Sequence, residues 1–348
     1  MMKMTSKIDP HRCLRLLMGV MLCAAFWSLP AREASAAPTC SATMSALEFG
    51  DVDLVAGGTM TASAKLSYTC TNDNNNERHA LLCFNIGDGS ASQASGGGHW
   101  NPRILRDGLG NEMNVQFHQG PNPAIWGSTT QPIADAYDIA LTLPPRGLFA
   151  PSVTSGNFTL RGVISTGQPA LRPGLYQSDF NGNHTALRYG IANNSNGLPA
   201  NCASVGTNGG TFGFTASANV VKSCQVSADA LAFGEVDGIA SPTNIDATTT
   251  IRVVCSKQTA YNVLLVLSNN NTGGSSAMKG QAGNTDAVPY RLYSDSARSA
   301  PWGSLASNDV SGIGNGLTQS LTVYGRVPGL PNVQADNYKD TVIVNVTY

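Results

Sequence analysis

Six cysteines are the residues whose type and spacing predict the most definite chemistry in this chain. The sequence has eight cysteines, but Cys13 and Cys23 lie within the first 36 residues, which have the pattern of a removable export signal. An even number of cysteines in an exported chain predicts disulfide bonds. A zinc site is a poor alternative, because the sequence contains no Cys-x2-Cys pair and no neighbouring pair of histidines.

An internal repeat predicts how the cysteines pair. The sequence around Cys40 returns 184 residues later around Cys224. The matched positions are Cys40 with Cys224, Phe49-Gly50 with Phe233-Gly234, Cys70 with Cys255, Trp126 with Trp302 and Tyr176 with Tyr338. The equivalent disulfides Cys40–Cys70 and Cys224–Cys255 then leave Cys83–Cys202 to close the first copy. Both tryptophans recur at matched places, which favours a role in the core of each copy.

Two pairs of acidic residues also follow the repeat. Asp51-Val52-Asp53 and Glu235-Val236-Asp237 occupy the same place in the two copies. Paired carboxylates could act in acid–base catalysis or bind calcium. We interpret them as part of a turn that both copies share, because no calcium-loop or hydrolase signature surrounds them. The histidines are scattered, and no known nucleophile or phosphate-binding motif is present, so we predict neither an enzyme nor a cofactor.

The N-terminus predicts export from the cytoplasm. Four basic residues precede an apolar run from Leu16 to Leu29, and Ala34-Ser35-Ala36 offers a cleavage site. We therefore assign residues 1–36 to a signal peptide. A retained anchor is the alternative, although the run is shorter than the roughly 18 residues that a membrane helix needs. No other stretch predicts a membrane span.

The composition argues against nucleic acid as a partner. Without residues 1–36 the chain carries 16 basic and 20 acidic side chains, a net charge of −4, and it has no basic run. Charged residues are only 12% of the sequence. Such a surface is typical of an extracellular β protein with many turns.

The sequence predicts an all-β protein with two tandem immunoglobulin-like sandwiches, at residues 37–220 and 221–348. Short alternating or β-branched segments are separated by Gly, Asn and Pro clusters, and no segment keeps a helical period. The expected strands lie at 60–70, 81–86, 139–143, 158–164, 211–220, 248–255, 261–267, 317–327 and 340–348.

The ends of the two copies differ. After Tyr176 the first copy continues into residues 211–220, whose alternating pattern predicts a final strand. The second copy ends on a strand that places Val342, Val344, Val346 and Tyr348 on one face. We therefore expect the C-terminal sandwich to lack its last strand and to expose a groove edge along this face. Donor-strand complementation by another chain would fill such a groove. The alternative is a C-terminal sandwich that is already complete.

These residues resemble the Spore Coat Protein U (SCPU) domain family. The resemblance rests on Cys-x8-Phe-Gly, on Trp-Gly in mid-domain, and on the closing segment from Asp336 to Tyr348. It is strong over residues 221–348 and weaker over residues 37–220. The family includes the pilins of archaic, Csu-type chaperone–usher pili. The resemblance implies an immunoglobulin-like pilin fold, with a periplasmic chaperone, an outer-membrane usher and a neighbouring pilin subunit as partners.

A two-domain subunit in such systems resembles the tip adhesin, in which an adhesive domain precedes a pilin domain. Only residues 37–39 separate the predicted cleavage site from Cys40, which is too short for a donor strand at about 3.3 Å per residue. We therefore expect a subunit at the end of a fibre, exported through the periplasm to the cell surface, where it mediates attachment and biofilm formation.

The first copy also gains loops that could bind a surface. The loops at 90–102, 119–126 and 143–151 are rich in Gly, Ser or Pro and carry apolar side chains. The candidate binding residues are Trp100, Ile125, Leu148 and Phe149, directed at an abiotic or host surface. The alternative interpretation is that these side chains pack on their own domain.

Two other functions remain open at this point. A secreted structural coat or matrix protein of the same family would need neither chaperone nor usher. A secreted carbohydrate-binding module or hydrolase would rest only on the β-sandwich and Trp100.

Overall fold

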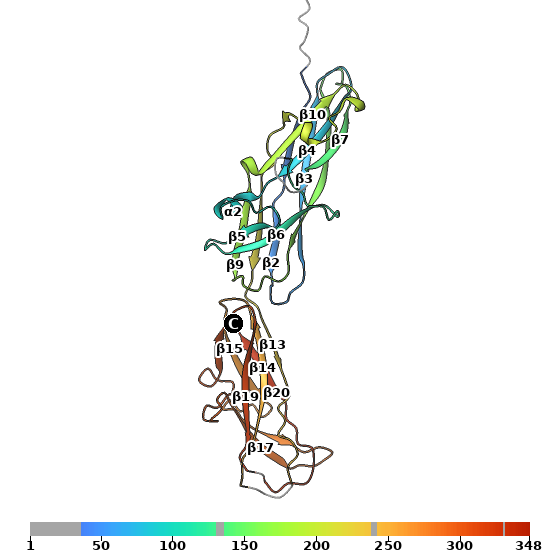
Figure 1. The fold of residues 1–348 in the computed structure, drawn as a ribbon. Coiled ribbons are helices and arrows are strands. Elements are labelled where there is room, and N and C mark those ends of the chain that lie inside the picture. Colours follow the sequence, from blue (N-terminus) through green and yellow to red (C-terminus); the bar gives the residue numbers. More distant parts are fainter. Residues whose placement is uncertain (1–35, 130–135, 238–241, 330) are drawn as a thin grey trace, which may run out of the picture.

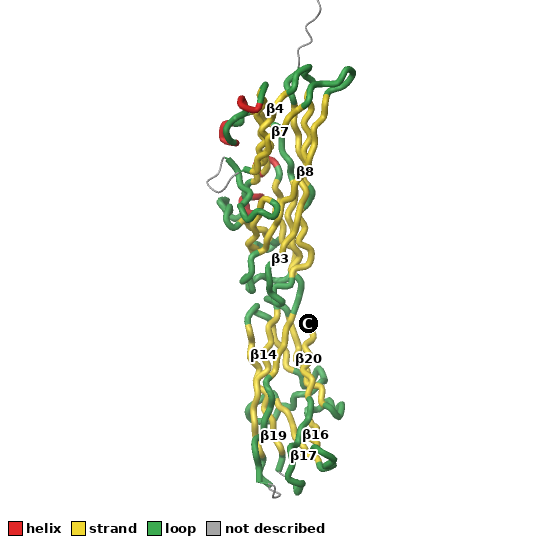
Figure 2. The backbone as a smooth tube through the Cα atoms, turned by 90° about the vertical axis from the view of Figure 1, so that its right-hand side faces the viewer, coloured by secondary structure: helices red, strands yellow, loops and turns green. Residues whose placement is uncertain are grey.

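The chain forms two β-rich modules stacked end to end (Figures 1 and 2). This computed structural model describes residues 36–129, 136–237, 242–329 and 331–348. Following the predicted limits, we call residues 37–220 the N-terminal module and residues 221–348 the C-terminal module. The predicted signal peptide, apart from Ala36, lies outside the described residues. Within the described part, no helix is long and apolar enough to cross a membrane. The predicted all-β fold is confirmed.

The N-terminal module packs an eight-stranded sheet against a four-stranded one. The eight-stranded sheet has the order β1-β3-β8-β6-β5-β9-β12-β2, and the other has the order β11-β10-β4-β7. The strands are β1 (Thr39–Met44), β2 (Leu47–Val52), β3 (Met60–Asn72), β4 (Arg78–Ile86), β5 (Arg103–Arg106), β6 (Glu112–Gln119), β7 (Tyr137–Leu143), β8 (Ser152–Ile164), β9 (Gly174–Phe180), β10 (Thr185–Ala192), β11 (Thr207–Asn208) and β12 (Phe214–Val220).

The C-terminal module is smaller and packs a five-stranded sheet against a three-stranded one. The orders are β13-β14-β19-β17-β16 and β18-β15-β20. The strands are β13 (Cys224–Ala228), β14 (Ile245–Cys255), β15 (Ala260–Leu267), β16 (Ser275–Lys279), β17 (Ala287–Tyr293), β18 (Val310–Ile313), β19 (Thr318–Val327) and β20 (Val342–Thr347). Each module has its own apolar core between its two sheets.

The repeat seen in the sequence is a repeat of structure. Trp126 and Trp302 are both buried, and their indole N–H groups donate to the carbonyls of Phe84 (2.8 Å) and Val263 (2.9 Å). These bonds make β4 equivalent to β15. β10 pairs with β4 as β20 pairs with β15, so β10 and β20 are equivalent as well. The matched tryptophans are core residues, as predicted.

The matched tyrosines hold equivalent corners of the two modules. The Tyr176 hydroxyl donates to the carbonyl of Arg172 at 3.0 Å, and the Tyr338 hydroxyl donates to the carbonyl of Gln334 at 2.7 Å. Both bonds reach back four residues, as in the tyrosine corner of immunoglobulin-like sandwiches. Both modules therefore contain the same hydrogen bond from a tyrosine hydroxyl to the backbone, which explains why tyrosine recurs at these positions.

Three disulfides join the cysteine pairs that the repeat predicted. Cys40–Cys70 and Cys224–Cys255 each link the first strand of a module to the strand beside it, with Cα atoms 4.1 Å apart in both cases. Cys83–Cys202 ties the segment after β10 to the outer face of β4. The first two bonds are equivalent to each other, one in each module, whereas Cys83–Cys202 is found in the N-terminal module alone.

A short connection joins the modules directly. The Val221 amide donates to the carbonyl of Val52 at 3.1 Å, and the Ser223 hydroxyl donates to Asp53 Oδ2 at 2.8 Å. Asp53 Oδ1 accepts from the amides of Val55 and Ala56, so this carboxylate holds a turn. The geometry at Asp53 matches the turn role that the sequence favoured for the repeated acidic pairs.

One predicted loop contains a short helix. Within the loop expected at 90–102, residues Gly89–Ala94 form α2. The Ala91 amide donates to the Ser178 hydroxyl at 3.1 Å, and Ala91 and Ser92 are buried. The helix thus depends on contacts with β9, which are remote in sequence and leave no local periodic signal.

Candidate assembly groove and binding surfaces

Two segments that match in the repeat have different structures in the two modules. Residues 47–52 form β2, in which Leu47 and Val52 are fully buried. The equivalent residues 231–236, all of them described, form no strand, and Val236 is 44% exposed. In the N-terminal module β2 pairs in parallel with β12, from Ala216 opposite Leu47 to Val220 opposite Val52. Residues 231–236 have no such partner among the described residues, which explains why they form no strand, and Leu231 and Phe233 are only half-buried.

β12 closes the N-terminal module. It lies between β2 and β9, and its inward side chains are all buried. They are Phe214, Ala216, Ala218 and Val220, and Phe212 just before β12 is buried as well; these five residues are the alternating set that the sequence singled out. Just before β12, β11 and the residues after it pair with the edge of β10, including a bond from the Leu187 amide to the carbonyl of Gly210 at 2.9 Å.

The equivalent edge of the C-terminal module is open. Within the described residues β20 pairs with β15 and with no other strand. Its inward residues Val342, Val344 and Val346 are only half-buried, whereas Leu187 and Tyr189 of β10 are buried. Tyr348, predicted on the same face, follows β20 and is 57% exposed. A strand equivalent to the closing segment of the N-terminal module is thus absent from the described C-terminal module.

An apolar groove occupies the position of that strand. It has a volume of about 620 Å³ and lies between residues 228–233 and the start of β20. Its apolar lining comes from both sheets and includes Leu231, Phe233, Ile251, Leu265, Val323 and Val344. We call it the C-terminal groove. An unpaired strand edge beside exposed apolar side chains is a template for another strand.

A polar cluster lines part of the C-terminal groove. Asp340 Oδ2 accepts from the hydroxyls of Tyr290 at 2.7 Å and Ser276 at 2.8 Å. Burial acts to raise the pKa of Asp340, but these and other hydrogen bonds outweigh it and hold the pKa below its usual range. Burial and the bond to Asp340 raise the pKa of Tyr290. The carboxylate therefore stays charged and fixes the entry into β20.

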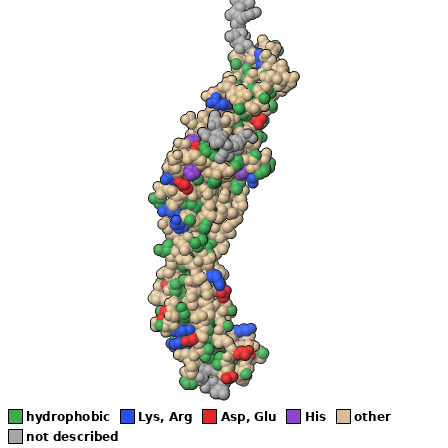
Figure 3. All heavy atoms as spheres, viewed as in Figure 1, with side chains coloured by type: hydrophobic (Ala, Val, Ile, Leu, Met, Phe, Trp, Pro, Cys, Tyr) green, Lys and Arg blue, Asp and Glu red, His purple; other side chains and the backbone are tan. Residues whose placement is uncertain are grey.

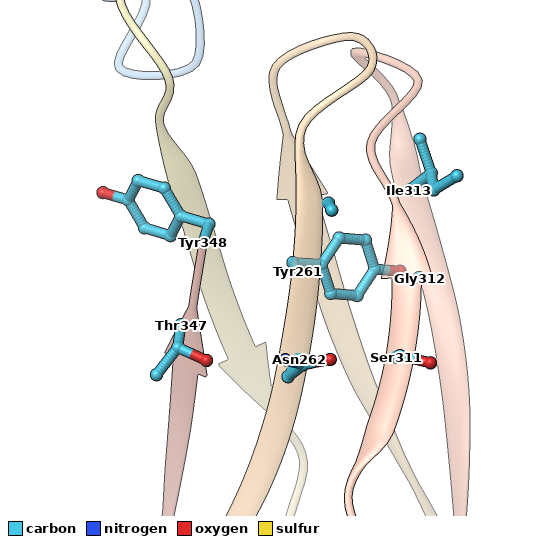
Figure 4. A pocket seen from close by; sticks show the side chains of 8 residues that line it. Tyr261, Asn262, Ser311, Gly312, Ile313, Thr347 and Tyr348 are labelled. Atoms are coloured by element: carbon cyan, nitrogen blue, oxygen red, sulfur yellow. The ribbon is translucent and has the colours of Figure 1, made fainter. Parts of the chain in front are cut away.

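A second hollow lies at the other end of β20, on the outer face of the three-stranded sheet (Figure 4). Thr347, Asn262 and Ser311 stand side by side there on adjacent strands, and Ile313 and Tyr348 flank them. The hollow measures about 520 Å³, but the side chains that line it come only from these three strands and from Tyr348 directly after β20. We assign it no ligand.

The most exposed apolar loop joins β7 to β8. Leu148 is 92% exposed and Phe149 is 95% exposed. The loop is nevertheless fixed, because the Arg146 amide donates to the carbonyl of Asn74 at 2.7 Å and the Gly147 amide donates to that of Ala150 at 2.9 Å. Prolines at both ends restrict it further. We call residues 144–151 the apolar loop.

The apolar loop lies at the end of the molecule farthest from the C-terminal module (Figures 1 and 2). β3 pairs with β8 from Met60 opposite Ile164, near the junction, to Asn72 opposite Ser152 at the far end. The apolar loop and the C-terminal groove are therefore on different modules, with the long β3–β8 pair between the loop and the junction.

The structure does not bring the four predicted binding residues together. Leu148 and Phe149 are in the apolar loop, but Trp100 and Ile125 are half-buried at mid-module. Ile125 forms a bridge with His118 at the end of β6, and Trp100 lines a separate polar hollow beside β10. The four residues therefore form no single surface.

Residues 210–345 match the family model of the Spore Coat Protein U domain. The C-terminal module matches the Spore Coat Protein U domain from its first residue to Asn345. The match begins at residue 210, ahead of β12, whereas the sequence pattern had placed the start of this domain at residue 221. The limits of the two domains stay a prediction.

The chain also has a curated relative. Protein U of Myxococcus xanthus is 37% identical over 67 residues, which are 19% of this chain and 37% of Protein U. The chain thus spans little more than a third of the length of the relative that it matches.

Two solved structures are similar to the whole chain. One is the chaperone–tip adhesion subunit pre-assembly complex CsuC–CsuE from archaic chaperone-usher Csu pili of Acinetobacter baumannii, at 15% identity and a TM-score of 0.48, covering 89% of this chain and 100% of that chain. The other is the CupB6 tip adhesin from Pseudomonas aeruginosa, at 10% identity and a TM-score of 0.36, covering 90% of this chain and 94% of that chain.

Sequence reasoning missed a buried cation in the module that precedes the Spore Coat Protein U domain. The Arg103 side chain is fully buried and donates to the carbonyls of Gly87 (2.6 Å), Ile86 (3.0 Å) and Trp126 (2.7 Å). It also donates to Gln116 Oε1 at 2.7 Å. Burial lowers the pKa of Arg103 to about 9, and the charge of Asp88 opposes that shift. No local pattern marks Arg103, because its acceptors come from distant segments.

Proposed function

We propose that this chain is the tip adhesin of an archaic chaperone–usher pilus. In this proposal the C-terminal groove accepts a strand from a periplasmic chaperone and later from a neighbouring pilin, and the N-terminal module touches the surface to which the cell attaches. Export, an outer-membrane usher and biofilm formation belong to the same proposal. No catalytic step is part of it.

One observation carries the proposal. The two modules share strands, tryptophans and tyrosine corners, yet within the described residues only the N-terminal module has a closing strand. The position of that strand in the C-terminal module is an apolar groove beside an open edge. Donor-strand complementation is the recurring way in which such an edge is filled. The Spore Coat Protein U domain, together with the family resemblance of the sequence, supports an assembly role for this module.

Co-expression with a candidate periplasmic chaperone tests the groove. We expect a stable 1:1 complex that Val344→Asp abolishes, because Val344 lines the C-terminal groove and a buried unpaired carboxylate costs several kcal/mol. Ile343→Asp is the matched control, because Ile343 directly precedes Val344 in β20, points to the opposite face and is 57% exposed. Size-exclusion chromatography with mass measurement reads out the complex. Equal complex formation by the two variants would contradict the groove.

The apolar loop is the proposed contact with the surface. Replacing both Leu148 and Phe149 by Ser should weaken adhesion of piliated cells by at least about tenfold, because burying one such side chain stabilises by roughly 1.5–3 kcal/mol. Leu109→Ser is the control, since Leu109 is 69% exposed on the hairpin between β5 and β6, away from the apolar loop. Pilus number should stay the same in both variants. Unchanged adhesion of the double variant would remove this loop from the proposal.

A secreted structural coat or matrix protein is the second candidate. The match to Protein U and the name of the domain family favour it. Such a protein would need no chaperone, so secretion of a folded chain in cells without chaperone and usher would support this candidate over the pilus.

A further inference from the structure

The N-terminal module carries a polar hollow that the proposed function does not use. Its volume is about 370 Å³, near the lower end of the roughly 300–1,000 Å³ of ligand pockets. Its lining includes Asn85, Asp88, Trp100, Asn183, His184 and Arg188. We call it the polar pocket. Arg188 and Asn85 lie on the face of β10 and β4 that points away from the core, because their neighbours Leu187 and Phe84 point into it.

The polar pocket is built from features that the C-terminal module lacks. Through the shared strand register, Arg188 and Cys83 correspond to Thr347 and Asn262, which lie in the open hollow of Figure 4. Residues 87–102, which include α2 and Trp100, stand where residues 268–274 join two strands in the C-terminal module. The pocket is therefore an addition to the shared fold.

Arg188 supplies a positive charge that no described acidic side chain pairs with. Its guanidinium group makes no ion pair and no hydrogen bond with any described residue, and the side chain is half-buried. Asp88, the carboxylate in the pocket, is already engaged: it accepts from the Ser92 hydroxyl at 2.6 Å and the Gly98 amide at 3.2 Å. The charge of Asp88 also interacts with buried Arg103. Among the described groups, none competes with an anion for the guanidinium of Arg188.

His184 completes the polar wall of the pocket. Its Nδ1 accepts from the Gly89 amide at 3.1 Å and lies 3.2 Å from Asp88 Oδ1. These two contacts fix the ring, and its Nε2 has no hydrogen-bond partner among the described residues. Nε2 can therefore exchange a hydrogen bond with a ligand in the pocket.

The remaining lining groups suit the faces and hydroxyls of a sugar ring. Trp100 is half-buried, and its indole N–H has no acceptor among the described residues. Asn183 and Thr211 are exposed side chains of the pocket without a hydrogen-bond partner in the described structure. A flat aromatic face packs against ring C–H groups, and amide and hydroxyl groups can exchange hydrogen bonds with sugar hydroxyls.

We propose that the polar pocket binds a sugar ring that carries a carboxylate, with Arg188 on the carboxylate and Trp100 against the ring. Arginine binds carboxylates through two parallel hydrogen bonds. A guanidinium without a described counter-charge therefore favours a sugar acid over a neutral sugar as the ligand. The polar pocket is separate from the C-terminal groove and from the apolar loop, so this inference does not rest on the pilus proposal.

Titration of the full exported chain with three probes tests this inference. Glucuronate should bind at least about tenfold more tightly than glucose and than acetate, because neither control probe offers both the ring and the carboxylate. Changes in the NMR signals of the tryptophan indole groups, or a calorimetric titration, report the affinity. Glucose binding as tightly as glucuronate would overturn the role of Arg188, equal binding of acetate would reduce the site to an anion site, and no binding of any probe would overturn the proposal.

Variants locate the binding. Arg188→Gln and Trp100→Ala should each weaken glucuronate binding by about tenfold or more. Arg291→Gln should leave it unchanged, since Arg291 is exposed on β17 of the other module. If Arg188→Gln disturbed folding, Arg188→Lys would keep the charge and should bind more weakly than the unaltered chain, because lysine cannot bind a carboxylate through two hydrogen bonds. Full binding by both Arg188 variants would overturn the assignment.

Discussion

A chain extended after Tyr348 by a short turn and a copy of residues 207–220 should fold as a stable monomer without any partner. The added strand would supply the inward side chains of Phe212, Phe214 and Val220 to the C-terminal groove. Each such side chain stabilises by roughly 1.5–3 kcal/mol when it is fully buried. We expect the unfolding midpoint of the C-terminal module to rise by more than about 10 °C.

The physical reason lies in the comparison of the two modules. In the N-terminal module this same segment pairs with the edge of β10 and then fills the space between β9 and β2. In the extended chain, the copy of β11 can pair with the edge of β20, and the copy of β12 can pair with residues 231–236. Hydrogen exchange should then show protection at residues 231–236, which are unpaired in the structure.

A matched extension controls for length and solubility. It carries Asp at the positions copied from Phe214, Ala216 and Ala218, so that the strand keeps its backbone but loses its apolar face. Light scattering and thermal unfolding should separate the two extensions clearly. If both extensions behaved alike, or if the unextended chain were already an equally stable monomer, the C-terminal module would not lack a strand.

The second large effect concerns Arg103. Arg103→Met should destabilise the N-terminal module by about 3–5 kcal/mol, because four acceptors lose one shared buried donor. That loss is a large fraction of the 5–15 kcal/mol that typically stabilises a domain. Amide hydrogens in β4 and β5 should therefore exchange more than about 100-fold faster.

The chain contains its own controls for this measurement. Arg106→Met changes a residue at the other end of β5 whose bond to the carbonyl of Ala94 is exposed, and it should cost less than about 1 kcal/mol. Peptides from the C-terminal module should keep their exchange rates in both variants. If Arg103→Met left the exchange of β4 unchanged, Arg103 would not hold the core of the N-terminal module.

Local signals were enough for several features. Alternation from Phe212 to Val220 marked a buried strand, because a strand with one buried face must alternate. The repeated cysteines gave the disulfide pairs, because equivalent positions in a duplicated fold meet equivalent neighbours. The repeated Trp126 and Trp302 were core residues for the same reason.

Other features of the candidate sites had no local signal. Trp100 and Ile125 looked like Leu148 and Phe149 in sequence, since all four are apolar residues in loops. Their burial differs because distant strands cover the first pair and leave the second at the end of the molecule. The free charge of Arg188 and the buried charge of Arg103 were equally invisible, because each depends on segments far away in the chain.

The sequence by itself determined that two copies of one β unit follow each other, which cysteines pair and which residues face inward. These properties depend on spacing and alternation, which the order of residues carries directly. Only the tertiary structure decided that residues 47–52 are a strand and residues 231–236 are not. A β-strand is stabilised by a partner that is remote in the chain. Equivalent residues therefore differ in structure when that partner is present in one module and absent from the described part of the other.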